Sequence, residues 1–210
     1  MKIKHEQDIN ELKKEIIEIK EQNNYLIDSL KKLKISEEKN NQPDDYFNFC
    51  FRKGINCTLS KDGKIAEKTD GDYDWNCTIV GDKEIPKNKL SKWKIKLKKF
   101  KITDNTVNTF IGVGPNNLDN KKHFYNYCWS LSCGEDKIWN KTKQIKYNNY
   151  PGNLNEGDII EVTVDMNRRT LSFKINGIDY GIACDDIPID EQLYPIVLIN
   201  DMNQMVEIVD

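Results

Sequence analysis

The stretch that decides the fold is GDIIEVTVDMNRRTLSFKING, residues 157–177. Apolar and polar residues alternate over 159–165 and again over 171–175, which is the period of a strand with one buried face. Asn176-Gly177 follows the second run and favours a two-residue hairpin, because a type I′ turn needs positive φ at both central positions. We therefore predict a twisted antiparallel sheet with exposed loops, a scaffold for binding rather than for catalysis.

The same strand pattern recurs along the chain from residue 45 onwards. In residues 92–98, Trp93, Ile95 and Leu97 alternate with lysines, so the apolar side chains point to the core and the lysines away from it. Shorter runs predict strands at 47–51, 56–60, 77–80, 109–113, 127–131, 193–198 and 206–209, with Trp129 in the core and a turn at 61–64. Many short strands without a helical period are typical of a mainly β protein, an antiparallel two-sheet β-sandwich.

Composition indicates one domain with an appendage. The chain has 210 residues, and 38% of them are hydrophobic, which is low for a fully globular protein, so part of it is expected to be extended or solvated. The formal net charge of −2 argues against a general polyanion binder. The charged N-terminus lacks the apolar run of a secretory signal, and no stretch reaches the ~20 apolar residues of a membrane span. We therefore expect a cytoplasmic protein without a membrane span.

A narrow apolar stripe near the N-terminus predicts an α-helical coiled coil. Its members are spaced three and four residues apart, with Ile9, Ile16, Asn23 and Leu30 at heptad position a and Leu12, Ile19, Leu26 and Leu33 at d. A single Asn at an a position specifies register and a dimer, because its amide pairs only with its mate across the axis. The flanking charges agree, since a parallel pair places Asp8 near Lys13, and Glu15 near Lys20, of the other helix.

These observations predict a parallel homodimer through residues 9–33. The alternative is one amphipathic helix packed on its own domain, but a narrow stripe with charged flanks suits a coiled coil better. After the helix, residues 36–45 carry no apolar anchor and include Pro43, as a solvated linker does. The predicted organisation is a coiled-coil helix at 1–35, a linker at 36–45 and a β-sandwich domain at 46–210.

No constellation in the sequence predicts catalysis or a bound metal. The six cysteines form no C-x-x-C pair and the only histidines are His5 and His123, which argues against a zinc site. A nucleophile needs a base within reach, and no motif ties a serine or cysteine to His123. The glycines of 112–114 precede Pro115 rather than a helix, so a strand ending in a turn explains them better than a nucleotide fingerprint. We expect a non-enzymatic protein without cofactors.

The ordered motifs after residue 157 resemble the SPRY domain family. They are Gly157-Asp158, the Leu-Ser-Phe strand at 171–173, Asn176-Gly177 and Leu193-Tyr194-Pro195. Upstream, Trp129 within 127–131 and the glycines within 111–114 resemble that family's earlier strands. The resemblance covers residues 45–210. It implies a bent two-sheet β-sandwich that binds peptide segments of other proteins through loops at one end.

Two loops carry the residues that this resemblance implies for peptide binding. Residues 70–75 form an acidic and aromatic loop, and Tyr and Trp recur at interface hot spots because they give large contact area at small entropic cost. Residues 200–203 follow the Leu-Tyr-Pro strand, where the family's peptide pocket also has a loop. The candidate peptide-binding residues are Asp70, Tyr73, Trp75, Asn200, Asp201 and Met202. Alternatively, Tyr73 and Trp75 pack the corner of the sandwich.

A cluster of eight lysines over residues 87–101 predicts a rival function. With Trp93 and Phe100 nearby, it fits a basic, aromatic surface for nucleic acid or an anionic membrane. The alternation, however, turns Trp93 into the core, and lysines on the outer face of a strand are usually solvated. We therefore favour an adaptor that binds an unidentified partner protein or peptide and is dimerised by its coiled coil, with the lysine strand as the alternative binding surface.

Overall fold

The computed structural model describes residues 19–20, 22–23, 46–52, 54, 56–70, 77–101, 109–116, 124–147 and 149–210. The chain divides into two units, Met1–Asp45 and Tyr46–Asp210. In the first unit only Ile19, Lys20, Gln22 and Asn23 are described, with helical backbone and exposed side chains. The other members of the predicted dimer seam lie outside the described residues: Ile9, Leu12, Ile16, Leu26, Leu30 and Leu33. The coiled coil therefore stays a prediction.

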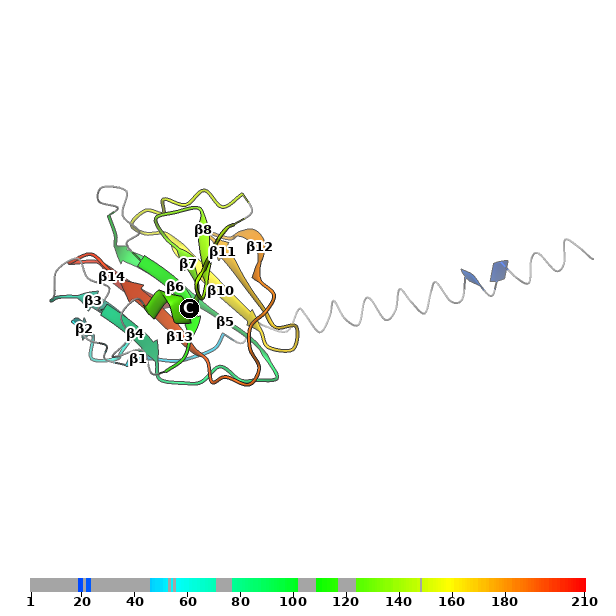
Figure 1. Ribbon diagram of the computed structural model, residues 1–210, viewed down its shortest axis with the longest axis horizontal. Helices are drawn as coiled ribbons and strands as arrows, with labels where there is room; N and C mark the ends of the chain where they lie inside the picture. Colours follow the sequence, from blue (N-terminus) through cyan, green and yellow to red (C-terminus); the bar gives the residue numbers. More distant parts are fainter. Residues whose placement is uncertain are drawn as a thin grey trace, which may run out of the picture. The chain divides into compact units, whose positions relative to one another are not determined.

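The described part of residues 46–210 forms two antiparallel sheets of seven strands each, which confirms the predicted mainly β architecture (Figure 1). The first sheet contains, in spatial order, β1 (Phe51–Arg52), β4 (Cys77–Gly81), β13 (Tyr194–Ile199), β6 (Thr109–Gly114), β7 (Trp129–Ser132), β8 (Lys137–Asn140) and β9 (Lys143–Lys146). The second contains β12 (Ile178–Cys184), β11 (Thr170–Ile175), β10 (Ile159–Asp165), β5 (Leu90–Lys99), β14 (Met205–Val209), β3 (Ile65–Lys68) and β2 (Cys57–Leu59). A 3-10 helix, η1 (Phe124–Tyr127), precedes β7.

The segment 157–177 folds as its pattern predicts. Strands β10 and β11 pair in register, with Ile160 opposite Ile175 and Val164 opposite Leu171. The chain then turns directly into β12, and φ is +51° at Asn176 and +83° at Gly177. Both values are positive, as a type I′ hairpin turn requires.

The main core lies between the two sheets and comes from alternate residues of their strands. On β5 the side chains of Trp93, Ile95 and Leu97 are buried, and Trp129 of β7 is buried with them, as predicted. Strands β4, β6 and β7 are buried along their whole length, because a second apolar cluster occupies the other face of the first sheet. Its buried members are Val80, Phe110, Cys128, Ile196 and Leu198. The first sheet is thus covered on both faces.

Two predicted strand boundaries are wrong. Of the segment 47–51 only Phe51 pairs in a strand, which continues to Arg52, although Phe49 and Phe51 are both buried. Ring contacts with Trp93 and between the phenylalanines, at centroid distances near 6 Å, bury this segment without a strand ladder. Tyr127, predicted inside a strand, belongs to η1 and is 42% exposed.

The thiols are mostly internal. Cys57, Cys77, Cys128, Cys133 and Cys184 are buried, Cys50 is partly exposed, and these six described cysteines form no disulfide. Burial raises the pKa of the Cys184 thiol to about 12. Among the described residues, no group of His, Cys, Asp or Glu is placed to hold a metal ion. Nor does that part of the chain contain a helix long and apolar enough to cross a bilayer.

Candidate functional site

Asp70 and residues 200–202, all predicted to bind peptide, lie at one end of the sandwich. Lys68 ends β3, and Asp70 follows it with an exposed side chain. The Lys68 backbone N–H donates to the carbonyl of Gln204, and Asn203 N–H donates to the Lys68 carbonyl, both at 3.0 Å. These two bonds hold the end of β3 at Lys68 against the turn between β13 and β14. We call this end of the domain, which carries Asp70 and residues 200–204, the loop end.

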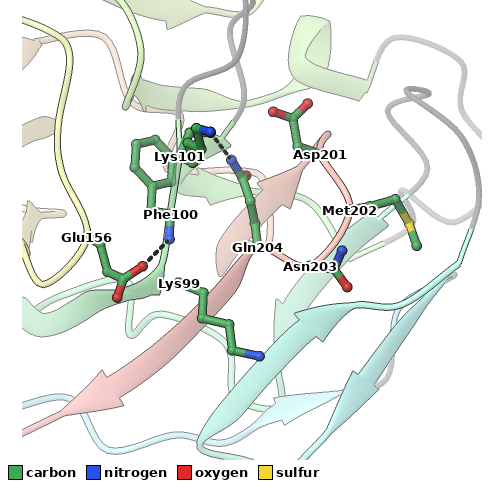
Figure 2. Close-up of a pocket in the computed structure, with 8 residues that line it drawn as sticks. All are labelled: Lys99, Phe100, Lys101, Glu156, Asp201, Met202, Asn203 and Gln204. Atoms are coloured by element: carbon green, nitrogen blue, oxygen red, sulfur yellow. Dashed lines mark hydrogen bonds between the residues drawn. The ribbon is translucent and has the colours of Figure 1, made fainter.

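A cavity of about 430 Å³ opens at the loop end (Figure 2). It lies between the end of β5 and the turn that joins β13 to β14. Its lining residues are Lys99, Phe100, Lys101, Glu156, Asp201, Met202, Asn203 and Gln204. A hollow of this size lies within the range of ligand pockets in proteins.

The turn beside the cavity is held rigidly by buried polar groups. Lys68 is completely buried, and its Nζ donates to the Asn200 carbonyl at 2.6 Å. Gln204, also buried, accepts from Thr109 Oγ1 at 2.6 Å and donates from Nε2 to the Lys101 carbonyl at 3.1 Å. Asn203 takes a left-handed φ of +63°. The turn therefore projects Met202, which is 41% exposed, from a fixed backbone.

The six predicted peptide-binding residues are distributed unevenly over this geometry. Met202 and Asp201 line the cavity, and Asp70 lies exposed at the same end. Asn200 and Asp201 are each only 5% exposed, and Asn200 is not among the residues that line the cavity. Its carbonyl instead anchors Lys68. Tyr73 and Trp75 lie outside the described residues. Direct contact of these six residues with a peptide stays a prediction.

Sequence reasoning missed one wall of the cavity. Phe100, Glu156 and Gln204 come from three separate segments and meet only in the folded domain. Glu156 Oε2 accepts from the Phe100 backbone N–H at 3.4 Å. No local pattern marks these residues, although Glu156 directly precedes Gly157-Asp158, the start of the stretch that decides the fold.

The charged groups that line the cavity nearly balance one another. Lys99 pairs with Glu67 across the sheet at 3.0 Å, and Lys101 and Glu156 add one charge of each sign. Asp201 brings a carboxyl group that is almost fully buried. The arrangement offers hydrogen-bond donors and acceptors around an apolar Met202 rather than a strong field of one sign.

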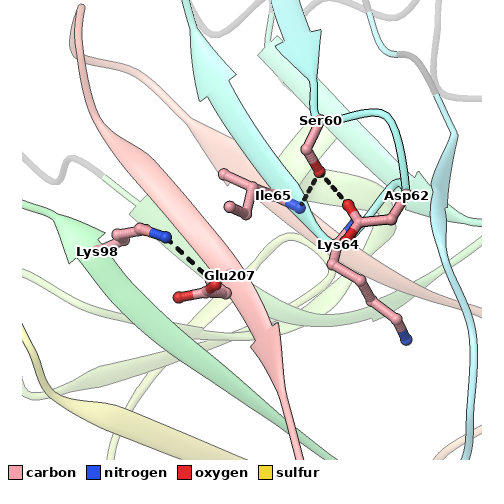
Figure 3. A network of polar contacts seen from close by, with 6 residues as sticks. All are labelled: Ser60, Asp62, Lys64, Ile65, Lys98 and Glu207. Carbon is pink, nitrogen blue, oxygen red and sulfur yellow. Dashed lines mark hydrogen bonds and ion pairs between the residues drawn. The ribbon is translucent and has the colours of Figure 1, made fainter.

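The lysines of β5 lie in a sheet face that alternates in charge. Lys98 pairs with Glu207 of β14 at 3.2 Å (Figure 3). Glu161 of β10 lies opposite Lys94, pairs with Lys174 at 3.6 Å and accepts from the Tyr46 hydroxyl at 2.9 Å. Cross-strand pairs of opposite charge stabilise a sheet modestly. Because acids interleave the lysines and Trp93 is in the core, this face gives the nucleic-acid or membrane alternative no support.

Together, the fold and this site define a β-sandwich domain with a cavity framed by loops at one end. The model of the SPRY domain matches residues 91–210, more than half of the chain, and the chain belongs to the SPRY family. No curated protein sequence gives a significant match.

Solved structures agree with this fold. The SPRY domain of human HERC1 is similar at 21% identity and a TM-score of 0.62, over 78% of this chain and 98% of that domain. The TRIM65 PSpry domain is similar at 12% identity and a TM-score of 0.59, over 79% and 93%. The NHR1 domain of Neuralized from Drosophila melanogaster is similar at 16% identity and a TM-score of 0.55, over 80% and 99%. At these identities the likeness concerns the fold.

Proposed function

We propose that the protein is a non-enzymatic adaptor that binds peptide segments of a partner protein through the loop end of its SPRY domain. The SPRY domain is a general protein–protein interaction fold. The observation that carries the proposal is the cavity of about 430 Å³ beside a turn that presents an exposed Met202. We place this function in the cytoplasm, where its six thiols stay reduced.

The held turn favours binding because it loses little freedom when a ligand arrives. Lys68 and Gln204 fix the backbone on either side of Met202 before any partner is present. A preorganised site pays less ordering entropy, so more of the contact energy appears as affinity. Met202 supplies an adaptable apolar contact, while the polar groups among the lining residues orient the peptide backbone.

The coiled coil adds a second element to the proposal. If residues 9–33 pair in parallel, one coiled coil joins two SPRY domains, each through its linker at 36–45. The second domain then binds a clustered or dimeric target at high effective concentration, without any new contact. Avidity of this kind lets a weak peptide site hold a partner firmly.

Partner capture from a native lysate tests the proposal. The full chain, a Met202→Glu variant and an Ile189→Glu variant serve as baits. Ile189 is a matched control, since it is 53% exposed but lies before β13, at the opposite end of that strand from Met202. We expect a protein that the wild type and Ile189→Glu retain and Met202→Glu loses. Equal recovery by all three baits, or recovery of nucleic acid alone, contradicts the proposal.

A further inference from the structure

Two sheet edges lie on the same side of the sandwich. Strand β9 ends the first sheet and β12 ends the second. The Tyr147 hydroxyl, one residue beyond β9, donates to the Gly181 carbonyl of β12 at 2.6 Å. Asn140 of β8 donates from Nδ2 to the two carboxylate oxygens of Asp186 at 2.9 and 3.1 Å. Figure 1 shows β8 and β12 at this side of the domain. We call the surface formed by residues 143–146 and 178–185 the edge face.

The edge face exposes more apolar surface than a solvated sheet edge needs. Ile145 is 42% exposed, Ile178 61% and Ile182 59%. Natural proteins usually protect sheet edges with charges, bulges or very short strands. At the opposite side of the sandwich the edge strands β1 and β2 are only two and three residues long. The edge face therefore differs from the other edges in both length and apolar content.

Strand addition does not explain the exposed isoleucines. Tyr180 and Gly181 together face Phe173, so β12 carries a bulge there. Gly181 N–H donates to Asp179 Oδ1 at 2.8 Å, and its carbonyl accepts from Tyr147. Both backbone groups of Gly181 thus have partners, so the bulge would interrupt the ladder of an added strand, and the side chains of the edge face offer the better contact.

Charges on the edge face are sorted by strand. Two contacts across the side define two levels along the strands. At the first level, Lys143 lies opposite Asn140, which binds Asp186, so Lys143 and Asp185 share that level. At the second, Lys146 precedes Tyr147, which reaches Gly181, and Asp179 lies two residues before Gly181; Lys146 also pairs with Asp136 of its own chain at 3.3 Å. All four charged side chains are exposed. The β9 rim is thus basic and the β12 rim acidic.

A twofold axis along the strands makes this surface complementary to itself. Such an axis, running between the two rims, keeps each level and places β9 of one copy against β12 of the other. Lys143 then faces Asp185 of the second copy, and the end of β9 at Lys146 lies towards the acidic β12 rim of the second copy. An axis in the plane of the surface but perpendicular to the strands would instead place β9 against β9 and β12 against β12, with like charges together. Charge and apolar content therefore select one arrangement.

We propose that the edge face is a self-association surface, through which two copies of this chain form an isologous pair of SPRY domains. Lys143 and Asp185 make no ion pair within the described part of their own chain, so both are available to a second copy. The exposed isoleucines supply the apolar centre of the interface. The charged side chains of the β9 and β12 rims supply its polar rim, which is the usual anatomy of an interface. This surface is distinct from the loop end and from the predicted coil.

Sedimentation velocity on the full chain tests the proposal once the coil is silenced. The double substitution Ile16→Asp/Leu26→Asp places charges at two apolar positions of the seam and changes no residue of the β-sandwich domain. In this background we expect a reversible monomer–dimer equilibrium at low salt between about 10 and 300 µM, the range in which a weak interface is half populated. Monomer throughout that range would overturn the proposal.

Charge swaps identify the surface and its symmetry. In the chain that carries Ile16→Asp/Leu26→Asp, Lys143→Asp alone and Asp185→Lys alone should each weaken dimerisation about fivefold to tenfold. Each substitution is present in both copies, so it alters two contacts of the symmetric interface. The double variant Lys143→Asp/Asp185→Lys should restore wild-type association. A dimer that either single swap leaves unchanged, or that the double swap fails to restore, refutes this arrangement and indicates another surface or partner. Circular dichroism checks that each variant is folded.

Discussion

Lys68 is completely buried, and its ammonium group donates to the backbone carbonyl of Asn200 at 2.6 Å. This contact joins the end of β3 in the second sheet to the end of β13 in the first. Burial of a lysine is costly unless the charge is well satisfied. The position is therefore informative: the ammonium group stabilises the loop end, where the turn that presents Met202 begins.

Replacement of Lys68 by Met should destabilise the domain. The thioether side chain fills a similar volume but leaves the Asn200 carbonyl without its donor, which costs about 1–3 kcal/mol for a bond to a charged group. Urea unfolding measures the loss in the free energy of unfolding. The control is Lys99→Met, because Lys99 is 54% exposed and its pair with Glu67 contributes about 0–1 kcal/mol. Equal losses for the two variants contradict the stabilising role of Lys68.

Gly112 of β6 should tolerate no side chain. A Cβ at this position would collide with the Trp129 carbonyl and approach Ser130 Cα to 2.7 Å, both in the neighbouring strand. Overpacking against backbone costs typically 1–3 kcal/mol or more, so Gly112→Ala should lower the thermal midpoint strongly. Gly177→Ala is the control with open space around it, where only the positive φ of +83° opposes alanine, at a cost of about 1 kcal/mol. A larger loss at Gly177 would show that close strand approach does not dominate.

The strands that sequence predicts well are those with one face in the core and one in solvent. Ile160, Val162 and Val164 of β10 alternate with half-exposed residues, as do Trp93, Ile95 and Leu97 of β5. Strand β12 does not show this alternation, because it is an edge strand with a bulge at Gly181 and exposes residues on both faces. Its residues 178–184 therefore show no clean period.

The site is predictable only in part, for a related reason. Met202 follows a recognisable strand and is 41% exposed. Whether Asn200 and Asp201 face outward depends on how the turn rotates, and that is set by the contacts of Lys68 and Gln204, which are remote in sequence. Phe100 and Glu156 reach the cavity from segments that show no local signal of binding.

Acid should loosen the turn between β2 and β3. Asp62 Oδ1 accepts from Ser60 Oγ and from the Lys64 N–H, and these hydrogen bonds hold the pKa of the Asp62 carboxyl below its usual range (Figure 3). A carboxyl whose pKa is depressed by folding stabilises the fold above its unfolded pKa, and that contribution is lost as pH falls through the folded value.

Carboxyl NMR titration measures the Asp62 effect directly. In the wild type the Asp62 resonance should titrate below its ordinary pKa of 3.8, and Ser60→Ala should return the midpoint towards that value, because the largest cause is removed. Ser172→Ala, on the outer face of β11, is the control and should leave the midpoint unchanged. A wild-type midpoint at or above 3.8 would show that the turn does not favour the ionised form.

Asn23 should set the oligomer number of the predicted coil. In a parallel dimer its amide pairs with its mate at an a position, so Asn23→Leu should tighten association by roughly tenfold or more and allow trimers or larger species. Sedimentation equilibrium on the full chain follows both effects, with Lys143→Asp present in every variant so that the edge face contributes less and to the same extent in each. Asn24→Leu adds the same side chain one residue outside the seam and should change neither quantity. If both leucine variants behave alike, or if Asn23→Leu weakens association, residues 9–33 do not pair through this seam.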